Sequence, residues 1–143
     1  MKLSTKVRYA TRAMLDLALH FNEGAIQIKG ICERQDVSEQ YLKNLLVSLR
    51  VANLVRSVRG PRGGFTLARP PSQIRVIEII RAMEGSIALA DCIDTPEICS
   101  RADLCVTRDL WTEMGDAMNA VVESTSLQDL VERQPQKQES STN

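Results

Sequence analysis

Residues 54–68 read LVRSVRGPRGGFTLA, a stretch that places two short apolar segments on either side of a turn rich in glycine and arginine. Residues 54–58 and 65–68 have the β-branched and aromatic content of strands, and RGPRGG between them is typical of a turn. The stretch therefore predicts a β-hairpin with a basic tip. Arginines on such a tip suit the narrow, negatively charged minor groove of DNA, although a basic turn can also be an ordinary solvated surface.

Two short helices are predicted immediately before this hairpin. The segments 25–35 and 38–53 carry apolar residues at helical spacing, and Ser38 is a residue type that commonly caps a helix N-terminus. Helices joined by so tight a turn form a helix-turn-helix, whose second helix enters the major groove. With a helix over residues 5–22 in front and the hairpin behind, the order of elements is that of a winged helix-turn-helix domain over residues 1–84.

The charges of the chain are distributed unevenly between its two halves. The net charge is zero, yet residues 1–75 hold 13 Lys and Arg against 5 Asp and Glu, a net charge of +8, and residues 76–143 hold the reverse, a net charge of −8. A basic surface of this strength indicates a polyanionic partner or is simply solvated. Because it coincides with the helix-turn-helix and the basic hairpin, double-stranded DNA is the better interpretation.

Three segments of the basic half resemble a known family. They are MKLSTKVRYATRAMLDLAL (1–19), ICERQDVSEQYL (31–42) and LVRSVRGPRGGF (54–65). They closely resemble the IscR family of bacterial winged-helix regulators, which includes the iron–sulfur, nitric-oxide and iron sensors IscR, NsrR and RirA. The resemblance covers residues 1–132, and it implies a homodimeric transcription regulator that binds a near-palindromic operator.

The same resemblance implies which side chains contact DNA. The family pattern places recognition-helix contacts at Ser38, Gln40, Tyr41, Lys43 and Asn44, and wing contacts at Arg59, Gly60 and Arg62. IscR itself has an acidic residue where this chain has Lys43, so the resemblance does not carry over the base preference of the operator.

The acidic half predicts two further helices and a tail. Residues 74–85 are amphipathic and end at Gly85, and a longer helix is expected from about residue 102 to residue 125. An apolar seam runs along the longer helix and consists of Leu110, Trp111, Met114, Met118, Val121 and Val122. The seam can pack on its own chain or on a second copy, and two DNA half-sites require a two-fold dimer.

We therefore expect residues 85–132 to form a cysteine loop and a dimerisation helix, and residues 133–143 to form a disordered tail. The fold class that follows is mainly α with a small β-hairpin wing. It combines a winged helix-turn-helix DNA-binding domain with a long dimerisation helix.

Three of the four cysteines lie in DCIDTPEICSRADLC, residues 91–105. Cys92, Cys99 and Cys105 are separated by six and five residues, whereas structural zinc sites pair their ligands two to four residues apart. The only histidine, His20, lies far away in the sequence, so we expect no base beside these thiols and no enzyme. Iron–sulfur clusters are held mainly by cysteine thiolates and suit this spacing better. Three unligated cysteines or a thiol sensor remain the alternative.

The family resemblance implies that Cys92, Cys99 and Cys105 are cluster ligands, with 2Fe–2S as the expected cluster and 4Fe–4S as the alternative. In IscR a histidine three residues after the last cysteine completes the cluster, and here that residue is Arg108, which cannot ligate. Other members use a carboxylate near the N-terminus of the partner subunit, where this chain has Arg8. The fourth ligand is therefore unassigned.

The sequence as a whole predicts a DNA-binding transcription regulator whose affinity is controlled by an iron–sulfur cluster that senses iron, cluster supply, redox state or nitric oxide. The alternative is a regulator of the same fold without a cofactor that responds to thiol chemistry or to a small effector. Cys32, on the inward side of the second helix, is expected to be a small buried residue. No apolar run is long enough to cross a membrane and no secretory signal is recognisable, so we expect a cytoplasmic protein.

Overall fold

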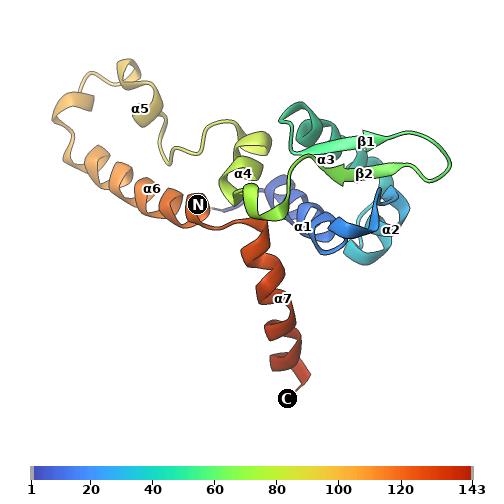
Figure 1. The fold of residues 1–143 in the computed structure, drawn as a ribbon. Coiled ribbons are helices and arrows are strands. Elements are labelled where there is room, and N and C mark those ends of the chain that lie inside the picture. Colours follow the sequence, from blue (N-terminus) through green and yellow to red (C-terminus); the bar gives the residue numbers. More distant parts are fainter. Residues whose placement is uncertain (1, 143) are drawn as a thin grey trace.

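The computed structural model describes residues 2–142, with only the backbone for residues 136 and 138–142, and it is mainly helical with one β-hairpin (Figure 1). The main elements follow in the order α1 (Thr5–Leu19), α2 (Ile28–Gln35), α3 (Glu39–Val51), β1 (Val55–Val58), β2 (Gly64–Leu67), α4 (Val76–Glu84), α5 (Asp91–Asp94), α6 (Val106–Ser124) and α7 (Leu127–Thr142). Single 3-10 turns lie at Phe21–Glu23, Pro71–Gln73, Pro96–Ile98 and Ala102–Leu104. The predicted fold class is confirmed.

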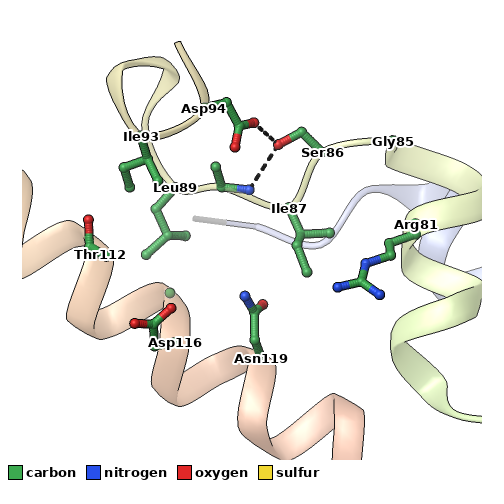
Figure 2. A pocket seen from close by; sticks show the side chains of 12 residues that line it. Arg81, Gly85, Ser86, Ile87, Leu89, Ile93, Asp94, Thr112, Asp116 and Asn119 are labelled. Carbon is green, nitrogen blue, oxygen red and sulfur yellow. Dashed lines mark hydrogen bonds between the residues drawn. The ribbon is translucent and has the colours of Figure 1, made fainter. Parts of the chain in front are cut away.

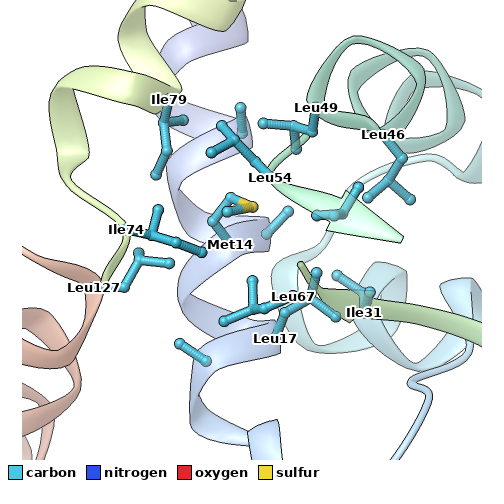
Figure 3. Close-up of a cluster of buried hydrophobic side chains, with 14 of the residues drawn as sticks. Met14, Leu17, Ile31, Leu46, Leu49, Leu54, Leu67, Ile74, Ile79 and Leu127 are labelled. Carbon is cyan, nitrogen blue, oxygen red and sulfur yellow. The ribbon is translucent and has the colours of Figure 1, made fainter. Parts of the chain in front are cut away.

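One hydrophobic core is built around α1. Figure 3 shows Met14 and Leu17 of this helix among side chains from every neighbouring element. The fully buried contributors from elsewhere include Ile31, Leu42, Leu46, Leu49, Leu54, Ile74, Ile79 and Leu127. Because these residues are aliphatic and span most of the chain, burial of their apolar surface from water is what holds the helix-turn-helix and the hairpin in one body.

The hairpin is fixed to the helix-turn-helix by a glycine. Val55 pairs with Leu67 and Val58 with Gly64 in the antiparallel ladder. Beside it, Ile26 and Phe65 exchange two backbone hydrogen bonds of 2.8 Å, so the segment before α2 lies against β2. A Cβ on Gly64 would lie 2.2 Å from the carbonyl oxygen of Ile26, and the φ of Gly64 is +155°. Only glycine allows the two backbones to approach this closely.

After α6 the chain returns to the N-terminal body. The Val76 N–H donates to the Thr125 carbonyl and the Leu127 N–H donates to the Ile74 carbonyl, each at 2.9 Å. Leu127 is fully buried, and Leu130 packs against the core. The sequence grouped residues 85–132 with the cysteine loop and the dimerisation helix, but the structure places the start of α7 in the core of the DNA-binding body. That difference arises from backbone pairing between distant segments, which sequence periodicity does not reveal.

The structure gives α7 the bounds Leu127–Thr142, and Asn143 lies outside the described residues; the disordered tail expected over residues 133–143 stays a prediction. Ser126 and Asp129 cap the start of the helix reciprocally: the Ser126 N–H donates to Oδ2 of Asp129, and the Asp129 N–H donates to Oγ of Ser126. The Ser126 N–H, with its hydroxyl as the second cause, holds the pKa of the Asp129 carboxyl below its usual range. After its buried first turn, α7 has Glu, Gln and Lys residues on both sides of Pro135. These residue types have high helix propensity, and a search for apolar periodicity does not detect a helix formed by them.

None of the helices in the described part of the chain combines the length and the apolar content that spanning a bilayer requires.

Candidate DNA-binding surface and cysteine loop

The turn between α2 and α3 sets the position of the second helix. Asp36 adopts the left-handed conformation, with φ of 51°. The next residue, Val37, donates its N–H to the Cys32 carbonyl at 3.2 Å. Ser38 follows in an extended conformation, and its Oγ accepts the Tyr41 N–H at 3.2 Å. The helix-turn-helix and its serine cap, both predicted from the sequence, are therefore present.

The exposed side of α3 carries the polar residues that the sequence assigned to DNA contact. Gln40, Lys43 and Asn44 are exposed, and the Gln40 amide lies 3.5 Å from Oδ1 of Asn44. Lys43 pairs with Glu39 at 3.2 Å. Tyr41 is half-buried and packs edge-on against Tyr9, with ring centroids 5.8 Å apart. The opposite side of the helix is buried through Leu42, Leu45, Leu46 and Leu49.

Replacing Ser38 with Ala is expected to lower the free energy of unfolding by about 1 kcal/mol, because the Tyr41 N–H loses its only side-chain acceptor. Chemical denaturation followed by far-UV circular dichroism measures this change. Thr at the same position is the matched control and should retain most of the stability, and an unchanged midpoint for the Ala variant would contradict the cap.

The hairpin tip is a second exposed basic element. Figure 1 shows the loop between β1 and β2 extending away from the helices. Arg59, Gly60 and Arg62 are all exposed, and the Gly63 N–H donates to the Gly60 carbonyl at 2.9 Å. Within residues 2–142 neither arginine has an ion-pair partner, so both guanidinium groups are available to a ligand.

A buried carboxylate that sequence analysis missed joins α1 to α2. Asp16 is 1% exposed, and both of its oxygens accept hydrogen bonds from Arg34, at 2.7 and 2.9 Å. The amide of Gln35 donates to the same carboxylate at 3.0 Å. The bidentate pair raises the pKa of Arg34. Because α2 packs on α3, this pair fixes the frame that carries the exposed residues of α3.

The cysteine loop is made of short turns rather than long elements. Cys92 lies in the four-residue α5, Cys99 follows a 3-10 turn, and Cys105 is the N-cap of α6. The Arg108 N–H donates to Sγ of Cys105 at 3.4 Å, and Oγ1 of Thr107 lies 3.1 Å from that sulfur. These hydrogen bonds lower the pKa of the Cys105 thiol, because they stabilise its thiolate.

Arg108 occupies the place where the family resemblance implied a fourth ligand. Its Nε donates to the backbone carbonyl of Cys92 at 2.9 Å, so the side chain joins the start of α6 to α5. In the described part of the chain, no three His, Cys, Asp or Glu side chains lie close enough to hold a metal ion. All four cysteines are free. Thiols are the donors that iron–sulfur clusters take, so these residues fit a cluster in chemistry, although the structure does not gather the three sulfurs.

Cys32 differs from the three cysteines of the loop. It is half-buried against the hydrophobic core, and this burial raises the pKa of its thiol. This environment agrees with the prediction that Cys32 is a small core residue, although its side chain is not fully buried.

The apolar seam predicted on the long helix is largely uncovered. The helix begins at Val106 rather than near residue 102, because Cys105 caps it and a 3-10 turn precedes it. Leu110, Trp111, Met118 and Val121 are exposed by 39 to 63%. Large apolar side chains gathered on one helix in this way indicate an interaction surface.

Comparisons with known proteins agree with this architecture. Residues 3–133 match the model of the Rrf2 family, described as an iron-dependent transcriptional regulator. The HTH-type transcriptional regulator IscR of Photorhabdus laumondii is 42% identical over 134 residues, which cover 94% of this chain and 81% of that protein.

Solved structures give the same result. The structure of T. potens IscR has a TM-score of 0.77 and 41% identity, and covers 92% of this chain and 87% of its own. The structure of CymR, the global cysteine regulator of B. subtilis, has a TM-score of 0.79 and 37% identity, and covers 92% of this chain and 97% of its own. The family resemblance predicted from the sequence is confirmed: the chain belongs to the Rrf2 family and is a DNA-binding transcriptional regulator, not an enzyme.

Proposed function

We propose that this regulator binds a near-palindromic operator as a homodimer, with α3 in the major groove and the hairpin tip at the minor groove. The observation that carries the proposal is the pair of exposed polar elements, α3 and the tip, on the half of the chain with a net charge of +8. Phosphate and base contacts would come from Ser38, Gln40, Tyr41, Lys43, Asn44, Arg59, Gly60 and Arg62. A regulator of transcription acts where the chromosome lies, so we place the protein in the cytoplasm.

Two unpaired guanidinium groups at the tip provide the sharpest test of DNA binding. Replacing Arg59 and Arg62 together with Ala should weaken binding to a duplex selected from a random pool by about 10- to 100-fold. It should also reduce the slope of log affinity against log salt by about 4, because each of the two subunits loses two charged contacts. Fluorescence anisotropy over a salt series measures both quantities.

The matched control removes the same charge elsewhere. Arg101 and Arg133 are exposed and lie outside the proposed surface, in the cysteine loop and α7. Their double Ala variant should bind the duplex as the wild type does. Equal weakening by both double variants would mean that net charge alone attracts DNA, and would contradict a specific wing contact.

The exposed seam of α6 supports the homodimer, because reading two half-sites requires two recognition helices related by a two-fold axis. Val121 is 63% exposed in the single chain, so replacing it with Asp should not disturb folding. Sedimentation should instead show dimer dissociation at a concentration at least about tenfold higher than for the wild type, because the partner would bury an unpaired charge. Ala120→Asp, on a different side of the helix, is the control and should leave the dimer intact.

We propose that Cys92, Cys99 and Cys105 are ligands of an iron–sulfur cluster. The presence or loss of this cluster is the signal that changes operator affinity. The support is chemical: three free thiols within one short loop, in a chain whose family is described as iron-dependent. When bound, a cluster would supply a group sensitive to iron supply and oxidants. A 2Fe–2S cluster is the first expectation and a 4Fe–4S cluster the second. Arg108 and Arg8 leave the fourth ligand unassigned.

A second candidate is a regulator without a cofactor that senses thiol chemistry. Two observations favour it: the three sulfurs do not form a metal-binding group in the described residues, and hydrogen bonds lower the pKa of the Cys105 thiol. A thiolate is the reactive form of cysteine, so Cys105 would be the first residue oxidised. Iron content of protein purified without oxygen separates the two candidates.

A further inference from the structure

A cavity of about 340 Å³ lies between the two halves of the molecule (Figure 2). One wall is the C-terminal part of α4 with Arg81, the second is the segment 85–94, and the third is α6. The volume is at the lower end of the range for small-molecule sites, about 300–1,000 Å³. Neither the proposed DNA surface nor any of the three loop cysteines lines this cavity.

The cavity has opposite charges on opposite walls. Figure 2 shows Arg81 projecting from α4 and Asn119 projecting from α6 toward the same space, and Asp116 lines the cavity beside Asn119 on α6. Arg81 has only a loose ion pair with Glu123, at 3.8 Å and with both side chains 55% exposed, so little free energy holds it there. Among the described residues, Asp116 and Asn119 have no side-chain hydrogen bond or ion pair.

Apolar side chains separate these polar groups. Ile87, Leu89 and Ile93 are half-buried and line the cavity from the segment above α6. The side chain of Ser86 is already committed, because its hydroxyl bonds to Asp94 and accepts the Ala88 N–H at 3.1 Å. The polar groups open to a ligand are therefore the cation of Arg81, with its loose pair to Glu123, the anion of Asp116 and the amide of Asn119. The carboxylate of Asp94 also lines the cavity and accepts the Ser86 hydroxyl, and an apolar patch lies between the groups.

Gly115 keeps the α6 wall open. It lies in the interior of a 19-residue helix, where glycine is less favourable than alanine. A Cβ at this position would meet only Cγ of Leu89, at 4.0 Å, so packing does not require glycine here. What its missing side chain provides is space in the cavity.

The cavity face and the apolar seam occupy different sides of α6. Thr112, Gly115, Asp116 and Asn119 recur at helical spacing on the side of the cavity. Leu110 and Val121 of the exposed seam lie more than a quarter turn from all four of these residues, whereas Met118 is a neighbour of Gly115 on the helix surface. A second copy bound on the seam would therefore leave the walls of the cavity in place.

We propose that this cavity binds a small zwitterion of α-amino-acid size, with its carboxylate on Arg81, its ammonium on Asp116 and its short apolar side chain on Ile87, Leu89 and Ile93. Charge complementarity favours this ligand class, because its ammonium would pair with Asp116 and its carboxylate would replace Glu123, the loose partner of Arg81. The ligand would connect α4 of the DNA-binding body to α6 of the dimer helix. The inference requires neither an iron–sulfur cluster nor bound DNA.

The test is calorimetric titration of the full chain, without DNA, with each of the twenty standard L-amino acids. At least one should bind with Kd below about 1 mM, which is about −4 kcal/mol. Its N-acetyl derivative lacks the ammonium and its primary amide lacks the carboxylate, so each should bind at least about tenfold more weakly. Failure of all twenty, or equal binding of either derivative, would overturn the proposal.

Variants locate the ligand. Asp116→Asn should weaken binding of the same amino acid at least about tenfold, whereas Glu113→Gln, which removes the same charge from an exposed position on α6, should not. Gly115→Leu should abolish binding by filling the cavity, with an unchanged circular dichroism spectrum as evidence that α6 persists. If Asp116→Asn and Glu113→Gln behave alike, the ligand does not bind in this cavity.

Discussion

Replacing Asp16 with Ala is expected to lower the free energy of unfolding by about 3 kcal/mol, because it removes one partner of a buried ion pair. The carboxylate accepts two hydrogen bonds from Arg34 and one from Gln35, and its side chain is 2% exposed. Breaking such a pair typically costs about 3–5 kcal/mol, and the lower end applies because Arg34 is 41% exposed and regains water.

The expected loss concerns function as well as stability. Asp16 lies on α1 and its partners lie at the end of α2, directly before the turn into α3. Without the pair, the bonds from Arg12 to Gln35 are the remaining polar attachment of α2 to α1, and α3 loses part of its support. We therefore expect operator affinity to fall even at temperatures at which the variant remains folded.

Urea denaturation followed by circular dichroism measures the effect on stability. Glu33→Ala removes an exposed carboxylate from α2 and is the matched control, with an expected change below about 0.5 kcal/mol. A double variant, Asp16→Ala with Arg34→Met, should be more stable than the sum of the two single changes predicts, because neither buried charge is left alone. Strict additivity would show that the pair contributes nothing as a pair.

The winged helix-turn-helix could be predicted from the sequence because local chemistry determines most of it. Ser38 caps α3, the aliphatic spacing of α3 gives its buried face, and the glycines of the tip permit the hairpin. The return of α7 to the core could not be predicted in the same way. It depends on pairing of Ile74 with Leu127, far apart in the chain, and no periodicity encodes that contact.

The candidate site was predictable in residue types more than in geometry. Helix spacing and turn composition predict a helix-turn-helix and a basic tip, and the family resemblance implies which of their side chains contact DNA. Asp16 was missed because its partners lie 18 and 19 residues away and no spacing rule connects them. In the cysteine loop, the spacing of the cysteines predicts three ligands of the same chemical type. The loop consists of the four-residue α5 and two three-residue 3-10 turns, and such short elements do not determine in which direction each sulfur points.

The largest chemical effect is expected from the cysteines of that loop. Protein purified without oxygen should be coloured and contain iron and sulfide, and Cys92→Ala, Cys99→Ala and Cys105→Ala should each lose nearly all of both. The physical reason is that the chain offers only three loop thiolates, so no spare sulfur can replace a missing ligand. Metal analysis and native mass spectrometry measure iron, sulfide and dimer mass on one sample.

Cys32 supplies the matched control, because it is the only other cysteine and packs against the core rather than lying in the loop. Cys32→Ala should keep its iron. Operator affinity of the three loop variants should differ from that of the loaded wild type by about 5- to 150-fold, the range of a coupling free energy of about 1–3 kcal/mol. A colourless, iron-free wild type that still binds its operator would reject the cluster and favour the thiol sensor. In that case Cys105→Ala, whose thiolate is stabilised by Thr107 and Arg108, should be the variant that no longer responds to oxidants.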